Sequence, residues 1–148
     1  MYRFAQAAKT ARGFTLIELV VVITILGILA AFAVPRFVAL QTKARSSAIE
    51  SLEGALRSSS ALTHSMWVVT GGTSPVAMEG ADITMTNGYP SLVDIPNTLV
   101  DSSGFNYDPT TGTFTKIGAP DPTKCMVAYT PPAALGDPPS IIYDPSCD

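Results

Sequence analysis

The chain is poor in the side chains that most enzymes and metal sites need. Its 148 residues include one histidine, His64, and two cysteines, Cys125 and Cys147, and only 14% of the residues are charged. One histidine and two cysteines cannot form a closed four-ligand zinc site without carboxylates, and no run of spaced acidic residues predicts a calcium loop. Gly71-Gly72 lacks the surrounding pattern of a phosphate-binding loop. We therefore expect no enzymatic activity, no bound metal and no cofactor.

Positive charge is scarce once one short segment is set aside. Nine basic residues oppose twelve acidic ones, and Arg3, Lys9 and Arg12 all lie within the first 13 residues. Without those 13 residues, six basic side chains remain against twelve acidic ones, and the formal net charge falls to −6. A chain this acidic has no electrostatic basis for binding nucleic acid, so no nucleic-acid partner is predicted.

One region has almost no charge of either sign. The 21 residues from Phe14 to Val34 contain a single charged side chain, the carboxylate of Glu18. A helix of this length spans about 31 Å, close to the thickness of a bilayer core. A carboxylate there costs about 2.5–3.5 kcal/mol on insertion scales, so Glu18 needs a partner. We expect the sequence to offer one only if cleavage after Gly13 creates a positive amine on Phe14, in the same or a neighbouring copy.

Two simpler interpretations compete for this segment. An ordinary secretory signal peptide would use Ala31-Phe32-Ala33 as its cleavage site and release a soluble domain that begins at Val34. A plain single-pass anchor would place Glu18 near the membrane surface. Neither interpretation explains the Gly13–Phe14 junction together with the lone carboxylate.

The residues around this junction resemble the class III signal of type IV prepilins and their pseudopilin relatives; they read Arg12-Gly13-Phe14-Thr15-Leu16-Ile17-Glu18-Leu19-Val20-Val21-Val22-Ile23. The resemblance implies that a prepilin peptidase cleaves between Gly13 and Phe14 and methylates the new amine. It also implies that the N-terminal helices of many copies assemble into a filament, with Glu18 setting their register.

Gly27 and Pro35 also fall where this family has them, and the resemblance implies that the helix breaks or partly melts there when a filament extends. Pro35 lacks a backbone donor, and glycine has a low helix propensity. Glycine and proline are also common in transmembrane helices without such a role, and this alternative stays open.

Residues 14–66 are predicted to form one long helix, of which 14–40 is the transmembrane and filament-core segment. Gly71–Pro75 ends the helical pattern, and Trp67, near the expected end of the helix, is expected to pack under a sheet. Apolar residues recur at helical spacing beyond the uncharged segment, at Val38, Ala44, Ala48, Ile49, Leu52, Ala55, Leu56, Leu62 and Met66.

Residues 67–148 are expected to form a β-rich globular head. Strand-like runs with turn-rich boundaries lie at 105–108, 112–117, 125–130 and 140–143. They predict an antiparallel sheet whose apolar face is covered by the second half of the helix. The predicted fold class is therefore α+β and pilin-like, with a long N-terminal α-helix packed on a C-terminal antiparallel β-sheet.

The two cysteines lie near the C-terminus, 22 positions apart. An exported chain with an even number of cysteines favours a disulfide between Cys125 and Cys147, and two unpaired buried thiols are the alternative. The pairing also resembles the C-terminal disulfide loop of type IVa pilins, which lies on the filament surface and often contributes to adhesion.

Two shorter matches, Asn87-Gly88-Tyr89-Pro90 and the Cys-x-Val-x-Tyr strand from Cys125, resemble the mannose-sensitive haemagglutinin group of pilins. The implied function is a structural subunit of a type IV pilus that serves surface adhesion or motility. The alternative is a pseudopilin of a type II secretion or DNA-uptake system. The implied partners are other copies of the chain, the prepilin peptidase and the pilus assembly machinery. The subunit is expected in the inner membrane, with its leader cytoplasmic, and then in an extracellular filament.

Overall fold

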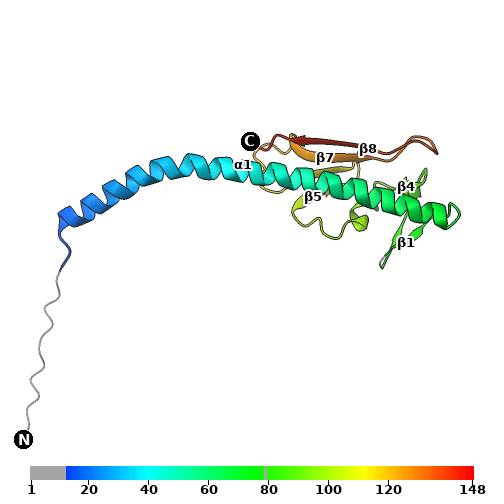
Figure 1. Ribbon diagram of the computed structural model, residues 1–148, viewed down its shortest axis with the longest axis horizontal. Helices are drawn as coiled ribbons and strands as arrows, with labels where there is room; N and C mark the ends of the chain where they lie inside the picture. The colour runs from blue at the N-terminus through cyan, green and yellow to red at the C-terminus, as the bar shows by residue number, and fades with distance from the viewer. Residues whose placement is uncertain (1–12, 79) are drawn as a thin grey trace, which may run out of the picture. The chain divides into compact units, whose positions relative to one another are not determined.

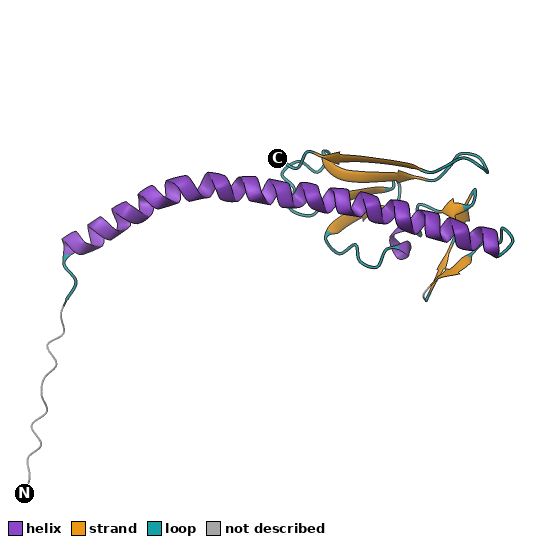
Figure 2. Ribbon diagram, in the orientation of Figure 1, coloured by secondary structure: helices purple, strands orange, loops and turns teal. Residues whose placement is uncertain are grey.

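The computed structural model describes residues 13–78 and 80–148 (Figure 1). The chain divides into two units, one ending at Ala39 and the other running from Leu40 to Asp148. Helix α1 (Leu16–Val69) begins in the first unit and ends in the second, where antiparallel strands make up most of the remaining regular structure (Figure 2). The fold class is α+β, as the sequence predicts.

The first unit exposes its apolar side chains. Phe14 is 89% exposed, and the large apolar side chains of α1 up to Leu40 are exposed as well. By length and composition, α1 can cross a membrane. Because a helix that is apolar on all sides needs an apolar environment, this segment requires lipid or other helices around it.

A four-stranded antiparallel sheet dominates the second unit. Its strands are β5 (Phe105–Asp108), β6 (Thr113–Lys116), β7 (Cys125–Thr130) and β8 (Ser140–Pro145), paired in that order. Consecutive strands are neighbours, so the sheet is a simple meander. The strands lie within two residues of the runs expected from the sequence.

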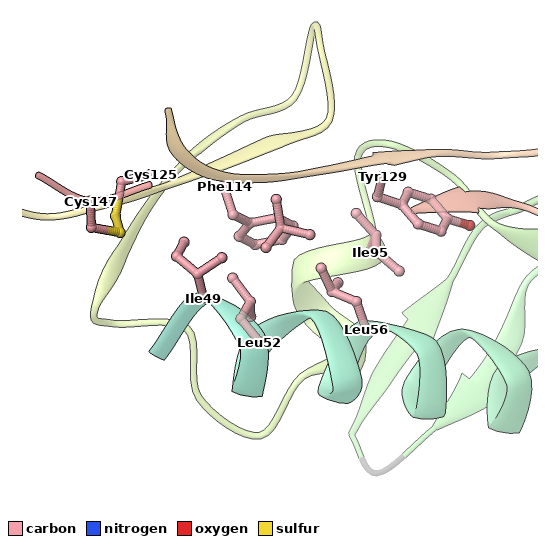
Figure 3. Packing of buried hydrophobic residues seen from close by; sticks show 9 residues of the cluster. Ile49, Leu52, Leu56, Ile95, Phe114, Cys125, Tyr129 and Cys147 are labelled. Carbon is pink, nitrogen blue, oxygen red and sulfur yellow. A yellow bond between two sulfur atoms is a disulfide. The ribbon is translucent and has the colours of Figure 1, made fainter. Parts of the chain in front are cut away.

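One face of this sheet and the second half of α1 enclose the core (Figure 3). Alternation along β7 directs every second side chain inward, and the inward ones are fully buried. Ile49, Leu52 and Leu56 of α1 face them across the core. The helix therefore covers the sheet as predicted. The buried cluster comprises Ile49, Leu52, Leu56, Ile95, Phe114, Cys125, Val127, Tyr129 and Cys147.

The buried stripe of α1 coincides with the predicted apolar positions only at Ile49, Leu52 and Leu56. Leu62 and Met66 are 56% and 37% exposed, whereas Ser60 and Thr63 are buried. The two buried hydroxyls donate to backbone carbonyls of the preceding turn, at 3.1 and 2.8 Å, so neither is left without a partner. Leu62 and Met66, which recur at helical spacing in the sequence, therefore lie outside the buried stripe.

Two short hairpins precede the main sheet, and the sequence analysis did not identify them. Strand β1 (Val76–Met78) pairs with β2 (Ala81–Ile83), and β3 (Met85–Thr86) pairs with β4 (Tyr89–Pro90). The second hairpin turns through Asn87 and Gly88, which have φ values of 50° and 86° and form the Asn-Gly turn typical of tight hairpins.

A short 3-10 helix and one tyrosine connect these hairpins to the main sheet. The 3-10 helix η1 (Ile95–Thr98) follows β4, and the Thr98 hydroxyl donates to the Ser59 hydroxyl of α1 at 3.0 Å. The buried Tyr129 hydroxyl of β7 donates to the Pro90 carbonyl of β4 at 2.8 Å. Burial raises the pKa of Tyr129 well above its usual range, so the hydroxyl stays a donor.

An aromatic stack holds the C-terminal end of α1. Trp67 does not lie under the main sheet: it stacks with His64, and His64 stacks on Tyr89 of β4, with ring centroids 5.8 and 4.2 Å apart. Nδ1 of His64 donates to the Gly88 carbonyl oxygen at 2.7 Å. A Cβ on Gly88 would lie 3.0 Å from the Trp67 ring, so glycine suits both the turn and this close approach. The expectation for Trp67 is therefore wrong, because the β3–β4 turn occupies the space beside it.

Candidate functional site

The junction predicted for processing lies immediately before α1. Gly13 and Phe14 are exposed and precede the first helical residue, Leu16. A Cβ on Gly13 would meet no atom within 4 Å, so packing within the described chain does not require glycine there. The basic leader residues Arg3, Lys9 and Arg12 lie outside the described residues.

Glu18 has a partner that the sequence analysis missed. Its carboxylate accepts hydrogen bonds from the Thr15 backbone N–H at 2.9 Å and from the Thr15 hydroxyl at 2.7 Å. In return, the Glu18 N–H donates to the Thr15 hydroxyl oxygen at 3.2 Å. This reciprocal pattern is a capping box, and Thr15-Leu16-Ile17-Glu18 carries its sequence signature. The expectation that only a new amine on Phe14 could serve Glu18 is therefore wrong.

The capping box places a negative charge in the first turn of α1. The unpaired N–H groups of that turn give the helix end a partial positive charge, which the carboxylate complements. A protonated amine on Phe14 would add a full positive charge four residues before Glu18. The arrangement can therefore hold a cation, from this chain or from a neighbour, beside the start of the helix.

Helix α1 runs through Gly27 and Pro35 without ending. Because Pro35 has no N–H, the carbonyl of Ala31 lacks its usual partner within the helix. A Cβ on Gly27 would meet no atom within 4 Å. A break at these two positions therefore stays a prediction about the helix in a filament.

A disulfide joins Cys125 to Cys147 in the second unit. Cys125 is the first residue of β7, and Cys147 lies two residues beyond the end of β8. Both cysteines are buried within the core cluster (Figure 3). The bond therefore ties the edge strand β8 to the core at the end where the chain finishes.

Three turns around the main sheet share the sequence Asp-Pro-Thr or Asp-Pro-Ser. In each, the Asp carboxylate accepts the N–H of the residue two positions later, at 2.8 to 2.9 Å; the acceptors are Asp108, Asp121 and Asp144. Hydrogen bonding lowers the pKa of each carboxyl below its usual range; for Asp121 the Thr123 hydroxyl, which donates at 2.6 Å, contributes most, and the N–H bonds contribute most for the other two. Among residues 13–78 and 80–148, no group of three or more His, Cys, Asp or Glu side chains is placed to hold a metal ion.

Comparison with known proteins places the N-terminal segment in a recognised class. Residues 8–34 match the family model described as the prokaryotic N-terminal methylation motif. The chain is 52% identical over 52 residues to the type IV narrow pilus major component PilA5 of Thermus thermophilus, which is 35% of this chain and 45% of that protein. It is 56% identical over 36 residues to the type IV major pilin protein PilA of Myxococcus xanthus, which is 24% of this chain and 16% of that protein.

The matches thus span less than half of either relative. No solved structure matches the chain. The methylation motif includes Gly13, Phe14, Glu18 and Gly27, and ends one residue before Pro35. Both relatives are pilins, and the structure has the apolar N-terminal helix followed by antiparallel sheets. Together these findings show that the N-terminal segment of the chain is similar to that of type IV pilins.

Proposed function

We propose that this chain is the structural subunit of a type IV pilus filament, processed between Gly13 and Phe14 by a prepilin peptidase and assembled through its N-terminal helix. The observation that carries the proposal is the first part of α1, which is apolar on all sides and has one carboxylate at its start. Such a helix needs lipid before assembly and neighbouring helices afterwards.

In this proposal the chain has three parts with separate tasks. Residues 1–13 are a leader, and their three basic side chains favour the cytoplasmic side of the membrane. Residues 14–66 form the assembly helix, with 14–40 in the membrane and later in the filament core. Residues 67–148 form the head, whose disulfide suits an oxidising compartment outside the cytoplasm.

The Glu18 carboxylate gives the assembly step its register. Moving an apolar helix from lipid into a bundle of similar helices changes the burial of apolar area little, so packing and polar contacts decide how the helices align. After cleavage, the positive amine of Phe14 on one subunit competes with Thr15 for the Glu18 carboxylate of a neighbour. When one partner of an ion pair buried among apolar helices is removed, the other is left as an unpaired charge, at a high cost in free energy. This cost favours the alignment in which both partners are paired.

The proposal includes a role of the assembled filament in surface adhesion or motility. Two relatives named as major pilus components support an abundant subunit rather than a sparse pseudopilin of a secretion or DNA-uptake system. The amount of filament distinguishes the two: a pilus subunit is recovered in quantity from sheared cells, and a pseudopilin is not.

The test is the mass and N-terminal sequence of the chain recovered from sheared extracellular material. A chain that begins at Phe14 and is about 14 Da heavier than its unmodified mass, from one methyl group, supports cleavage and methylation. A chain that begins at Val34 would show conventional secretion and overturn the proposal. Absence of the chain from extracellular filaments would overturn it as well.

A further inference from the structure

Charged side chains are divided unequally along the chain. Residues 19–49 contain no carboxylate and three cations, Arg36, Lys43 and Arg45, whereas residues 58–115 contain five carboxylates and no lysine or arginine. In a polymer of one chain, each contact surface must be complementary to a different surface of the same chain. The unequal charges therefore make these two segments candidates for facing surfaces on neighbouring copies.

The basic segment has exposed residues in the second unit. Lys43 is exposed and Arg45 is half-buried, and within the part of the chain that the structure describes neither forms an ion pair. Leu40 is 64% exposed. Residues at spacings of three and four share one side of a helix, so α1 has an exposed face, here called the Leu40 face, made up of Leu40, Lys43, Ala44 and Ser47.

The acidic segment contains a groove of about 500 Å³ beside α1, lined by both apolar and polar side chains. Leu62 is more than half exposed in it, and Val100 is fully exposed. The groove has no charged side chain among its described lining residues, which are Leu62, Met78, Asn97, Thr98, Leu99 and Val100. Uncovered apolar side chains of this size, grouped in a groove, mark a surface that another molecule covers.

Asp101 directly follows Val100, which is one of the residues that line this groove. It is exposed, and its carboxylate accepts the Ser103 N–H at 2.8 Å, which lowers its pKa and keeps it ionised. The carboxylate forms no ion pair within the described chain. A groove with exposed apolar side chains, followed in the sequence by an ionised carboxylate, is complementary to a helix face that has an apolar side chain and a cation one turn apart.

We propose that this groove receives the Leu40 face of a neighbouring copy, with Leu40 against Leu62 and Val100 and the Lys43 ammonium beside Asp101. This inference rests on the proposed function, since filament assembly is what brings a second copy into reach. Groove and helix face are different surfaces of one chain, so the contact is heterologous and repeats along an open helical polymer. The apolar contact supplies affinity, and the ion pair selects the partner and its orientation.

Charge reversal in the full-length chain tests the contact. Lys43→Glu and Asp101→Lys are each expected to lower the yield of sheared filament by about tenfold or more, because each places like charges opposite one another. The combined Lys43→Glu, Asp101→Lys chain restores opposite charges, and its yield is expected to return to within about threefold of wild type, as coupled neighbouring residues require.

Lys124→Glu is the matched control. It makes the same change of charge in the same unit, and it breaks only an exposed pair with Asp121, whose atoms are 4.0 Å apart. Its filament yield should equal that of the wild type. Normal yield from either Lys43→Glu or Asp101→Lys, or a combined variant no better than the single ones, would overturn the contact.

Two further outcomes distinguish a failed contact from a failed filament. Loss of Lys43→Glu subunits from the membrane before assembly would assign Lys43 to the lipid surface and overturn the contact. If wild-type cells make filaments without this chain, the proposed function itself fails. Normal filaments from all the variants refute only the contact.

A cysteine pair tests the geometry independently of charge. A chain carrying Leu40→Cys and Val100→Cys should form disulfide-linked multimers in filaments, because a disulfide needs Cα atoms within about 7 Å. Leu40→Cys combined with Val93→Cys is the control, since Val93 is exposed but does not line the groove. Multimers from the control alone, or from neither pair, would contradict the proposed arrangement.

Discussion

The two units of this chain treat apolar side chains in opposite ways. Up to Ala39, the described residues leave their large apolar side chains uncovered, whereas the unit from Leu40 onward encloses a core between α1 and one face of a sheet. The two parts of helix α1 are therefore stabilised in different ways. Its second part is stabilised by its own chain, and its first part depends on lipid or on other copies.

The largest difference in stability between the two units is expected from a substitution that leaves a cavity in the core of the second unit. Phe114→Ala removes a fully buried ring and is expected to lower the free energy of unfolding by about 3–5 kcal/mol. Phe32→Ala, which removes an exposed ring of the first unit, should change it by less than about 0.5 kcal/mol. Denaturation of the detergent-solubilised chain, followed by the fluorescence of the only tryptophan, Trp67, measures both. Equal effects would show that the two units unfold together.

Removal of the disulfide should have the next largest effect. Replacing Cys125 and Cys147 by serine frees a loop of 22-residue separation and should cost the second unit about 3 kcal/mol in the chain-entropy model. The first unit has no part in this bond, so membrane insertion should not change. Trp67 fluorescence during denaturation measures the first effect, and the membrane-bound fraction measures the second. Reduced insertion of the double variant would show that the head influences the anchor.

Glu18 sharpens the comparison, because it is the one charge in the uncovered part of the helix before Arg36. Glu18→Gln keeps a side chain that can complete the capping box but removes the charge. We expect Glu18→Gln and Glu18→Ala both to insert normally and to yield about tenfold less filament, because neither side chain can form an ion pair with the amine of Phe14. Quantification of sheared filament against membrane-bound subunit measures the effect. Normal yield from Glu18→Gln would assign Glu18 to capping alone.

Acid should produce the smallest effect on the stability of the second unit. Asp108, Asp121 and Asp144 have a lower pKa in the folded chain than the usual value of about 3.9, so their turns add stability above that pH and lose it as the pH falls further. Stability should therefore decline below about pH 4. The triple Asn variant keeps a hydrogen-bond acceptor in each turn, and its decline should be shallower. Denaturation midpoints measured between neutral pH and pH 3 would show this, and identical acid profiles would contradict it.

The sequence predicts those parts of the fold in which apolar residues recur regularly, either at every second position of a strand or at the spacing of a helix. Alternation of Cys125, Val127 and Tyr129 is visible in the sequence because each inward residue is apolar and each strand boundary contains turn residues. The α-helix was predicted for a similar reason. The hairpins β1 to β4 were missed, because strands of two or three residues are too short to show alternation.

Other features either leave no apolar pattern in the sequence or depend on contacts between segments far apart in it. Ser60 and Thr63 are buried because their hydroxyls are satisfied by the helix itself, so no apolar pattern marks them. The position of Trp67 depends on Gly88, twenty-one residues later. At the candidate site, Thr15-Leu16-Ile17-Glu18 carries the sequence signature of a capping box, because both partners lie within the first turn of the helix.

That capping box has a consequence for the supply of subunits. A carboxylate that already accepts hydrogen bonds from Thr15 of its own chain does not need a neighbour, so Glu18 gives an uncleaved subunit no reason to associate with another. We therefore expect uncleaved subunits to remain monomeric in the membrane, without aggregation or early polymerisation. Cleavage would supply the amine of Phe14, a cation that competes for the Glu18 carboxylate. The rate of filament growth would then depend on the activity of the peptidase rather than on the concentration of the precursor.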